Sequence, residues 1–305
     1  MAKKVLLVGA NGYVGSRFVE RFKDKYDLKC IDSLLRPGSL PSYIEHKDYR
    51  DMTKSELEEF DMCLWLAGYS SVPLSKANPV DCYENNYSGL VDFTNKFKGI
   101  LIYASSGSVY GIKKERNVTE DLELKPISIY NKTKMIAERI LLSYKKEIDI
   151  VCIRPATVCG FSKRLRLDVS VNMLTYQAYK KNKITVLGGK QIRPNIHIKD
   201  LVRLFHFSLK KKIPGHIINA GFENLSILNL AKKIQKKIKC KIIVKKSNDP
   251  RSYRLSSNKL EKLGFKRKYN IDYAILELKN FFESKNFKDK IDNYNIKKLK
   301  KLSFE

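Results

Sequence analysis

Along the first half of the chain, short apolar runs alternate with longer stretches in which apolar residues recur every three or four positions. A short apolar run bounded by turn residues predicts a strand, and the longer periodicity predicts a helix. We expect strands at 5–8, 28–31, 43–49, 61–66, 100–104 and 148–153. We expect helices at 14–22, 79–98 and 129–145, with a loop at 69–75. This alternation favours a parallel sheet covered by helices on both faces, with ligands at the carboxyl ends of its strands.

The alternation weakens beyond Pro155, where apolar runs are shorter and less regular. The pattern there predicts helices at 169–181 and 227–238, and strands at 184–187, 216–219 and 240–244. Residues 192–211 are expected to form a strand followed by a helix, and two amphipathic stretches follow Lys259. This half is typical of a smaller domain that covers a substrate.

Three glycines at three-residue spacing, Gly9, Gly12 and Gly15, follow the first apolar run. The first allows a tight turn, the second lets the backbone approach a pyrophosphate, and the third lets the helix pack closely on the strand. The start of that helix offers unpaired N–H groups to a phosphate. Asp32 ends the second strand, within reach of a ribose diol. The order of strand, turn, helix, strand and acid predicts a dinucleotide-binding unit.

The expected fold is therefore of the α/β class, with a Rossmann-type doubly wound parallel sheet and a smaller α/β carboxyl-terminal substrate domain. We place the NAD-binding domain at 1–155, with a segment near 195–212 returning to it. The substrate-binding domain would comprise 156–305.

The predicted cofactor is NAD, because Asp32 would repel the additional phosphate of NADP. Arg36 could approach such a phosphate, but we consider NADP the less favoured cofactor. Asp51 could either cap a turn or accept from an adenine amino group. Ala67 and Gly68 are small enough to lie beside a ribose or nicotinamide. The residues expected to contact the cofactor are Gly9, Asn11, Gly12, Tyr13, Val14, Gly15, Asp32, Asp51, Met52, Leu66, Ala67, Gly68, Ala104, Tyr130 and Lys134.

The chain has 305 residues, of which 43% are hydrophobic, and a formal net charge of +28. Such a charge could indicate a nucleic acid or an anionic membrane surface as partner. However, the lysines are spread along the chain and no nucleic-acid-binding motif is visible, so we expect neither partner. No apolar run reaches the length of a membrane span. The basic start is followed by an apolar run that glycine interrupts, and we interpret it as the first strand and not as a signal peptide.

The six cysteines are widely scattered and form no C-x-x-C pair. Most lie in or beside apolar runs, which is typical of reduced, buried thiols in a cytoplasmic protein. We predict no metal site. The cysteines are Cys30, Cys63, Cys82, Cys152, Cys159 and Cys240.

The candidate catalytic pair is Tyr130 and Lys134, which a helix would place on one face. The lysine and a bound nicotinamide would both lower the pKa of the phenol and make it a usable base. Six Y-x-x-x-K strings occur in this chain, but only this one opens a helix after a serine-rich strand end. Ser106 lies at that strand end and could hydrogen-bond the substrate oxygen, with Ser105 as the alternative.

In combination, the motifs G-A-N-G-Y-V-G, Y-A-S-S-G-S-V-Y-G, Y-N-K-T-K and R-P-A-T-V-C-G resemble the extended short-chain dehydrogenase/reductase family. Within it, the chain is most similar to NAD-dependent nucleotide-sugar epimerases and dehydratases, over nearly its whole length. The resemblance implies a nucleotide-diphospho-sugar substrate and a homodimer that pairs through the helices holding Asn86 and Tyr130.

The resemblance also implies roles for single residues. Tyr130 would be the catalytic base, Lys134 would hold the nicotinamide ribose and Ser106 would assist. The substrate diphosphate would be bound by Asn172, Arg193 and Arg251.

Two departures from the family pattern are informative. Dehydratases of this group carry Thr-Asp-Glu where this chain has Ser106, Gly107 and Ser108, so simple 4,6-dehydration is disfavoured. Cys159 replaces a common tyrosine, for which we have no mechanistic interpretation. We therefore expect hydride transfer at C4 of the sugar, as an epimerase, a dehydrogenase or a 4-keto-sugar reductase. The non-enzymatic alternative is a dinucleotide-sensing or nucleic-acid-binding protein on the same fold.

Overall fold

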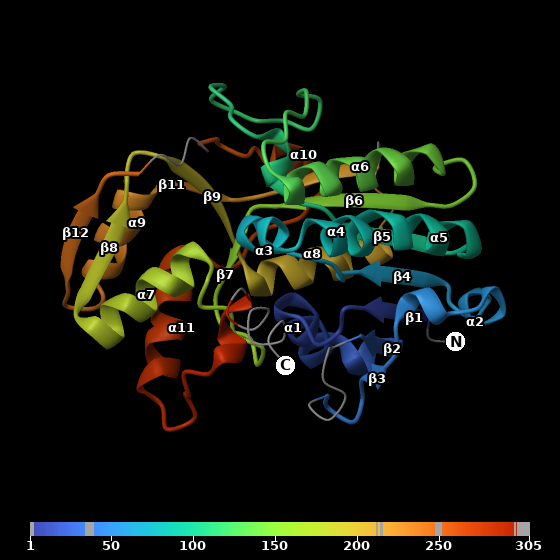
Figure 1. The fold of residues 1–305 in the computed structure, drawn as a ribbon, viewed down its shortest axis with the longest axis horizontal. Coiled ribbons are helices and arrows are strands. Elements are labelled where there is room, and N and C mark those ends of the chain that lie inside the picture. The colour runs from blue at the N-terminus through green and yellow to red at the C-terminus, as the bar shows by residue number, and fades with distance from the viewer. Residues whose placement is uncertain are drawn as a thin grey trace.

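The computed structural model describes residues 3–33, 40–211, 213, 216–247, 252–295 and 297. Its centre is a seven-stranded sheet with the order β10-β6-β5-β4-β1-β2-β3, in which all neighbours are parallel (Figure 1). The expected Rossmann-type sheet is thus confirmed. Its strands are β1 (Lys4–Val8), β2 (Asp27–Asp32), β3 (Glu45–His46), β4 (Met62–Trp65), β5 (Ile100–Ala104), β6 (Ile150–Pro155) and β10 (Ile217–Ala220).

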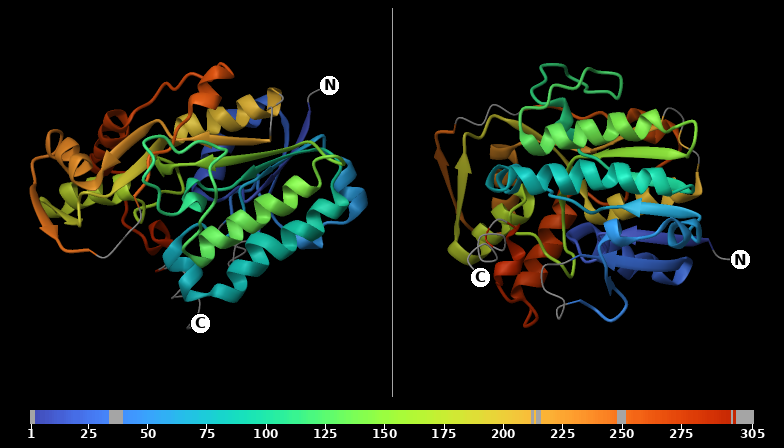
Figure 2. Two further views of the ribbon diagram at one scale, coloured as in Figure 1. Left: turned by 90° about the horizontal axis from the view of Figure 1, so that it is seen from above. Right: turned by 45° about the vertical axis from the view of Figure 1, so that its right-hand side comes forward.

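The strands are nearly continuous apolar runs because both faces of the sheet are covered. Along β1, Val5 and Leu7 belong to one core cluster, and Leu6 and Val8 to another. Helices α1 (Tyr13–Phe22) and α8 (Ile198–Lys210) pack on the first of these faces. On the other face lie α2 (Lys54–Glu58), α5 (Gly89–Lys96) and α6 (Ile129–Ser143) (Figure 2). Alternation of side chains along each strand therefore builds two cores from one sheet.

Apart from α8 and β10, the described part of the second half forms two small sheets and four α-helices. One sheet has the order β11-β9-β7, with β7 (Thr157–Cys159), β9 (Ile192–His197) and β11 (Glu223–Ser226). The other pairs β8 (Lys183–Leu187) with β12 (Lys241–Lys245). The helices are α7 (Ser170–Lys181), α9 (Ile227–Gln235), α10 (Asn258–Lys262) and α11 (Ile271–Glu283).

Two elements of the second half lie with the first. Helix α8 packs beside α1, and β10 extends the large sheet next to β6. We propose that the nucleotide-binding domain comprises 1–155 together with these two elements, and that the rest of 156–305 forms the substrate domain.

Some local elements differ from the sequence-based expectation. Helix α3 (Val72–Ala77) begins within segment 69–75, which was expected to be a loop. The helix forms because the Ser71 side chain caps it and Pro73 fits its first turn. The helix expected at 79–98 consists of α4 (Pro79–Tyr83), a π-helical turn (Glu84–Ser88) and α5. Strand β3 is shorter than the predicted 43–49, because Asp48 accepts from the Arg50 N–H at 2.9 Å and opens a 3₁₀ turn.

In the part of the chain that the structure describes, no helix combines the length and apolarity needed to cross a membrane. The six cysteines carry free thiols, of which Cys240 alone is half-buried and the others are buried.

Candidate active site

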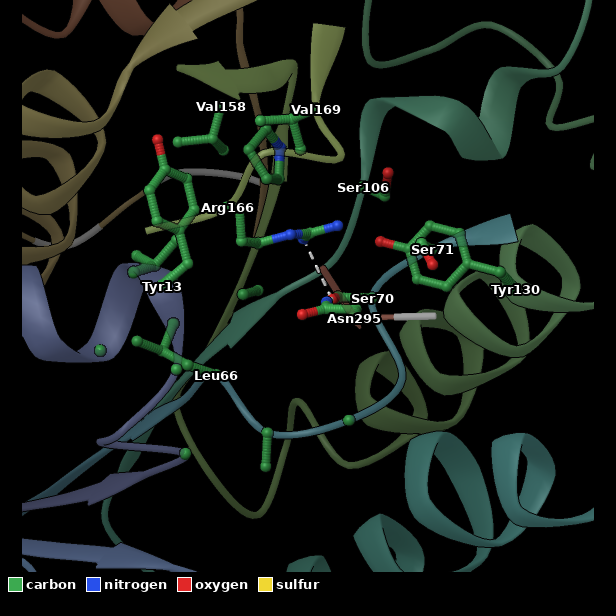
Figure 3. Close-up of a pocket in the computed structure, with 18 of the residues that line it drawn as sticks. Tyr13, Leu66, Ser70, Ser71, Ser106, Tyr130, Val158, Arg166, Val169 and Asn295 are labelled. Atoms are coloured by element: carbon green, nitrogen blue, oxygen red, sulfur yellow. Dashed lines mark hydrogen bonds between the residues drawn. The ribbon is translucent and has the colours of Figure 1, made fainter. Parts of the chain in front are cut away.

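A cavity of about 630 Å³ opens at the carboxyl ends of β1, β2, β4, β5 and β6, where a parallel sheet places its ligand site. Figure 3 shows its centre, with Tyr13 and Leu66 on one wall and Ser106 and Tyr130 on the other. The hydroxyl of Tyr130 points into the cavity (Figure 3). Residues from both halves of the chain line this space.

The three glycines of the turn differ in what a side chain at each of them would meet. Gly9 has a φ of +86°, and a Cβ there would lie 2.7 Å from the Ala67 nitrogen. A Cβ at Gly15 would overlap the Gly9 carbonyl oxygen. At Gly12, which caps α1, the nearest atom to a Cβ would be the Gly9 oxygen at 3.3 Å. Gly9 and Gly15 thus serve packing within the protein, whereas Gly12 leaves the start of α1 accessible to an anionic group.

Asp32 lies at the end of β2 and lines the cavity. Its Oδ2 atom accepts from the Asn11 N–H at 2.9 Å, which ties the acid to the glycine turn. Burial lowers the pKa of the Arg164 guanidinium below its usual value. The nearby carboxylates of Asp292 and Asp32 oppose this shift. A cation therefore stands near the acid that we expect to bind the adenosine ribose. Arg36 lies outside the described residues.

The other residues predicted to contact the cofactor separate into two groups. Those that line the cavity are Asn11, Tyr13, Val14, Leu66, Ala67, Gly68 and Ala104. Asp51 and Met52 do not line it. Asp51 is exposed at the end of the 3₁₀ turn, and Met52 is buried in the core between the sheet and α2. Contact of either residue with adenine stays a prediction.

The first turns of α6 hold the candidate catalytic pair. Ser128 caps this helix by accepting from the Asn131 N–H, and the Tyr130 N–H donates to Ser75 Oγ at 3.1 Å. One turn later, Lys134 Nζ donates to the Ala104 carbonyl at 2.9 Å. The end of β5 thereby holds the ammonium at the cavity wall.

The Ser106 side chain lies near enough to the Tyr130 phenol to lower its pKa. Its Oγ lies 2.7 Å from Ser108 Oγ, which donates to Asn131 Oδ1 at 2.8 Å. Ser105 also borders the cavity, but its hydroxyl donates to the buried carboxylate of Glu138. The geometry therefore favours Ser106 over Ser105 as the serine that meets a substrate.

Burial raises the pKa of the Tyr130 phenol, while the nearby Ser106 hydroxyl and the charge of Arg166 oppose that rise. Burial also lowers the pKa of Lys134, to about 8. We predicted a phenol pKa below its usual value, produced by Lys134 and bound nicotinamide. The protein alone does not produce it, because loss of solvent at Tyr130 outweighs the groups that favour the phenolate.

Sequence reasoning missed the segment around Arg166. The Arg166 Nη1 atom donates to Ser70 Oγ at 3.2 Å across the cavity (Figure 3). The Arg166 Nε atom donates to Asp168 Oδ1 at 2.9 Å. Asn295, far along the chain, donates its N–H to Asp168 at 3.2 Å. The available signal was the R-L-R-L-D alternation, in which the two leucines are buried and the arginines face the cavity.

The three residues predicted to bind the substrate diphosphate have different positions. Arg193 lines the cavity, and its Nη1 donates to the Ile192 carbonyl at 3.2 Å. Arg251 lies outside the described residues. Asn172 is buried and does not line the cavity. Its amide accepts from the Gly160 N–H at 3.0 Å and donates to the Arg166 carbonyl at 2.9 Å, so it holds the segment that carries Arg166.

Known proteins match this chain over most of its length. The family described as NAD dependent epimerase/dehydratase matches residues 5–221. A UDP-glucose 4-epimerase from Lactobacillus helveticus is 29% identical, over 94% of this chain and 100% of the relative. A GDP-6-deoxy-D-talose 4-dehydrogenase from Aggregatibacter actinomycetemcomitans is 25% identical, over 71% of this chain and 73% of the relative.

A solved structure is also similar. It is a variant of UDP-glucuronic acid 4-epimerase from Bacillus cereus, in complex with UDP-4-deoxy-4-fluoro-glucuronic acid and NAD. The TM-score is 0.81 at 25% identity, over 91% of this chain and 99% of that one. The resemblance found in the sequence and the choice of NAD are thereby confirmed. This chain is an NAD-dependent enzyme of the short-chain dehydrogenase/reductase type and belongs to the NAD dependent epimerase/dehydratase family.

Proposed function

We propose that this enzyme oxidises or epimerises a nucleotide-diphospho-sugar at C4 by hydride transfer assisted by Tyr130. The observation that carries the proposal is that Ser106, Tyr130 and Lys134 line the same cavity as the glycine turn. The names of the relatives support the substrate class, since they include 4-epimerases of UDP-sugars and a 4-dehydrogenase of a GDP-sugar.

NAD, when bound, supplies a nicotinamide that can take up a hydride and return it. Tyr130 takes the proton of the sugar 4-hydroxyl while the hydrogen on C4 leaves as hydride, so C4 becomes a ketone. Ser106 holds the oxygen as its bond to carbon changes. Return of hydride to the opposite face of C4, with return of the proton from Tyr130, gives the epimer. Release of the ketone gives net oxidation instead.

The cavity provides electrostatic support for the proton transfer. Arg166 bears a positive charge that favours the phenolate of Tyr130 over the phenol. We propose that Lys134, which donates to the Ala104 carbonyl, holds the nicotinamide ribose. We further propose that Arg193 contacts the substrate diphosphate and that Asn172 acts through Arg166. A role for Arg251 stays a prediction.

The same cavity argues against elimination of water. Among the described residues, the carboxylates that line it are Asp32, at the cofactor turn, and Asp168. Asp168 is already bound by Arg166 and Asn295. A Cβ at Gly107 would lie 3.2 Å from both a Leu255 methyl carbon and the Pro155 oxygen, which leaves little room for an acidic side chain. Dehydration would need an acid and base at this place.

The experiment that tests the proposal measures interconversion of UDP-sugar C4 epimers by purified enzyme with NAD. We expect Tyr130→Phe to lose nearly all turnover, whereas Tyr43→Phe, at an exposed tyrosine of another Y-x-x-x-K string, keeps it. Full turnover in Tyr130→Phe would reject the mechanism. Accumulation of NADH without epimer would assign the enzyme as a C4 dehydrogenase or, in reverse, a 4-keto-sugar reductase.

We also propose a homodimer formed through α6 and through α4 and α5, which follow one another and lie beside α6 (Figure 1). Val80 and Tyr83 on α4 are large apolar side chains left exposed on the monomer. Light scattering of Val80→Glu/Tyr83→Glu should show half the mass of the wild-type particle, and an unchanged mass would contradict this interface. The free thiols support our proposal that the protein works in the reducing cytoplasm.

A further inference from the structure

The small sheet of β8 and β12 lies at the end of the molecule away from the seven-stranded sheet (Figure 1). Its two strands are parallel, and α7 and α9 pack on one face, where Ile184 and Val186 are buried. Parallel sheets are normally covered on both faces. On the second face, by contrast, most of the side chains that the structure describes are exposed to solvent.

This open face, which we call the outer face, consists of Lys183, Thr185 and Leu187 from β8 and of Lys241, Ile243 and Lys245 from β12. In the register of the two strands, Lys183 is opposite Lys241, and Leu187 is opposite Lys245. Leu187 is 55% exposed and Ile243 is 39% exposed. Like charges directly opposite one another destabilise a strand pair. The sheet thus combines internal repulsion with exposed apolar side chains.

The surroundings of the outer face do not neutralise its charge. Segments 180–190 and 227–247, which form this sheet, the end of α7 and the whole of α9, contain twelve lysines and no aspartate or glutamate. Within the described residues, Lys233 alone among these lysines forms an ion pair, with Asp272. The remaining eleven are exposed. A large positive potential therefore surrounds the apolar side chains.

We propose that the outer face binds the surface of an anionic lipid bilayer. Lysines near such a surface are attracted by its negative potential, and Leu187 and Ile243 can enter the boundary between headgroups and acyl chains. A nucleic acid is a poorer match, because the two segments contain no arginine to pair with bases and no aromatic ring on which bases stack.

This proposal replaces our expectation of no membrane partner, which rested on the even spread of lysines along the sequence. The fold brings together two segments that are far apart in the chain and that both lack acidic residues. No residue of the outer face lines the active-site cavity, so binding to lipid leaves that cavity accessible.

The test is co-sedimentation of the full chain with vesicles of equal parts phosphatidylglycerol and phosphatidylcholine, compared with pure phosphatidylcholine. We expect binding only to the anionic vesicles, weakening as salt screens the charges. Lys183→Gln/Lys241→Gln/Lys245→Gln should bind them roughly a hundredfold more weakly at low ionic strength. Leu187→Thr/Ile243→Thr should also bind more weakly, because the lost contribution is apolar burial.

The matched control is Lys98→Gln/Lys145→Gln/Lys146→Gln, which removes the same charge from exposed lysines at the amino ends of β5 and β6. It should bind vesicles like the wild type. Equal loss in both triple variants would overturn the proposal and assign the binding to net charge. Tight binding of a short DNA duplex without binding to anionic vesicles would also overturn it. Unchanged melting temperature and turnover in every variant would exclude misfolding as the cause of a loss.

Discussion

The buried ion pair between Glu138 and Arg154 gives the sharpest stability prediction. Glu138 is 1% exposed and Arg154 3% exposed. The Arg154 Nε atom lies 3.0 Å from Glu138 Oε1, and its Nη2 lies 2.6 Å from Oε2. The Ser105 hydroxyl donates to the same carboxylate. Through Ser105, which follows β5, the ion pair is connected to the strand end that borders the active-site cavity.

We expect Glu138→Leu to lower the free energy of unfolding by about 3–5 kcal/mol. Two Arg154 groups, Nε–H and Nη2–H, would lose their acceptor, and each such charged hydrogen bond contributes about 1.5–3 kcal/mol. That sum agrees with the loss of about 3–5 kcal/mol found when one partner of a buried pair is removed. The Arg154 Nη1 keeps the Tyr110 hydroxyl at 2.6 Å, which limits the loss.

The double variant Glu138→Leu/Arg154→Met separates burial of an unpaired charge from loss of packing. Replacing both charges by apolar side chains of similar size is often neutral or stabilising. We therefore expect the double variant to be more stable than Glu138→Leu alone. Glu138→Gln, which retains one acceptor oxygen, should lie between wild type and Glu138→Leu.

The assay is thermal unfolding followed by circular dichroism at matched protein concentration. With roughly 2 °C per kcal/mol in a chain of this size, the single variant should melt roughly 6–10 °C below the wild type. A loss below about 1 kcal/mol, or a double variant that loses as much as the two single variants together, would refute this reasoning. A small loss would mean that Arg154 finds other acceptors. Additive losses would mean that Glu138 and Arg154 have no interaction free energy with each other.

Three further outcomes can be measured. Burial lowers the pKa of Lys134 from 10.5 to about 8, so the contribution of this residue to the stability of the cofactor-free protein should grow as pH rises across that window. The difference in melting temperature between wild type and Lys134→Met should therefore change with pH in that direction, and a difference that does not change would contradict it. Burial alone would raise the pKa of Glu277, but His197, Lys199 and the Phe161 N–H bring it down to about 2. The stability that this carboxylate gives to the protein should be complete above pH 4.5 and be lost as pH falls towards 2. An equally steep loss of stability in acid for Glu277→Gln would contradict this. Arg166→Leu should shift the pH profile of kcat/KM to higher pH, because a charge that favours the Tyr130 phenolate is gone, and an unshifted profile would disprove that link.

Much of the cofactor half could be predicted because its signals are local. The turn from Gly9 to Gly15 joins one strand to the next helix, and the acid at Asp32 ends the following strand. Backbone freedom and close approach at these glycines depend on neighbouring residues in sequence, so a single pattern reveals them.

The rest of the site depends on contacts between distant segments. Arg166 meets Ser70 across 96 positions, and Asn295 meets Asp168 across 127. No periodicity records which loop lies opposite another, because that is set by how the second half packs on the sheet. The raised pKa of Tyr130 has the same origin, since desolvation depends on every group that surrounds the phenol.

Local sequence patterns were enough to predict the parallel sheet, the dinucleotide turn and the helix that carries Tyr130 and Lys134. These follow from side-chain periodicity and from the conformational freedom of glycine, which act over a few residues. Only the tertiary structure decided that Ser105 is committed to Glu138, that Arg166 faces Tyr130, and that two acid-free segments meet in one basic sheet. Charge, burial and hydrogen-bond partners are properties of a place in space, and residues far apart in the chain create that place together.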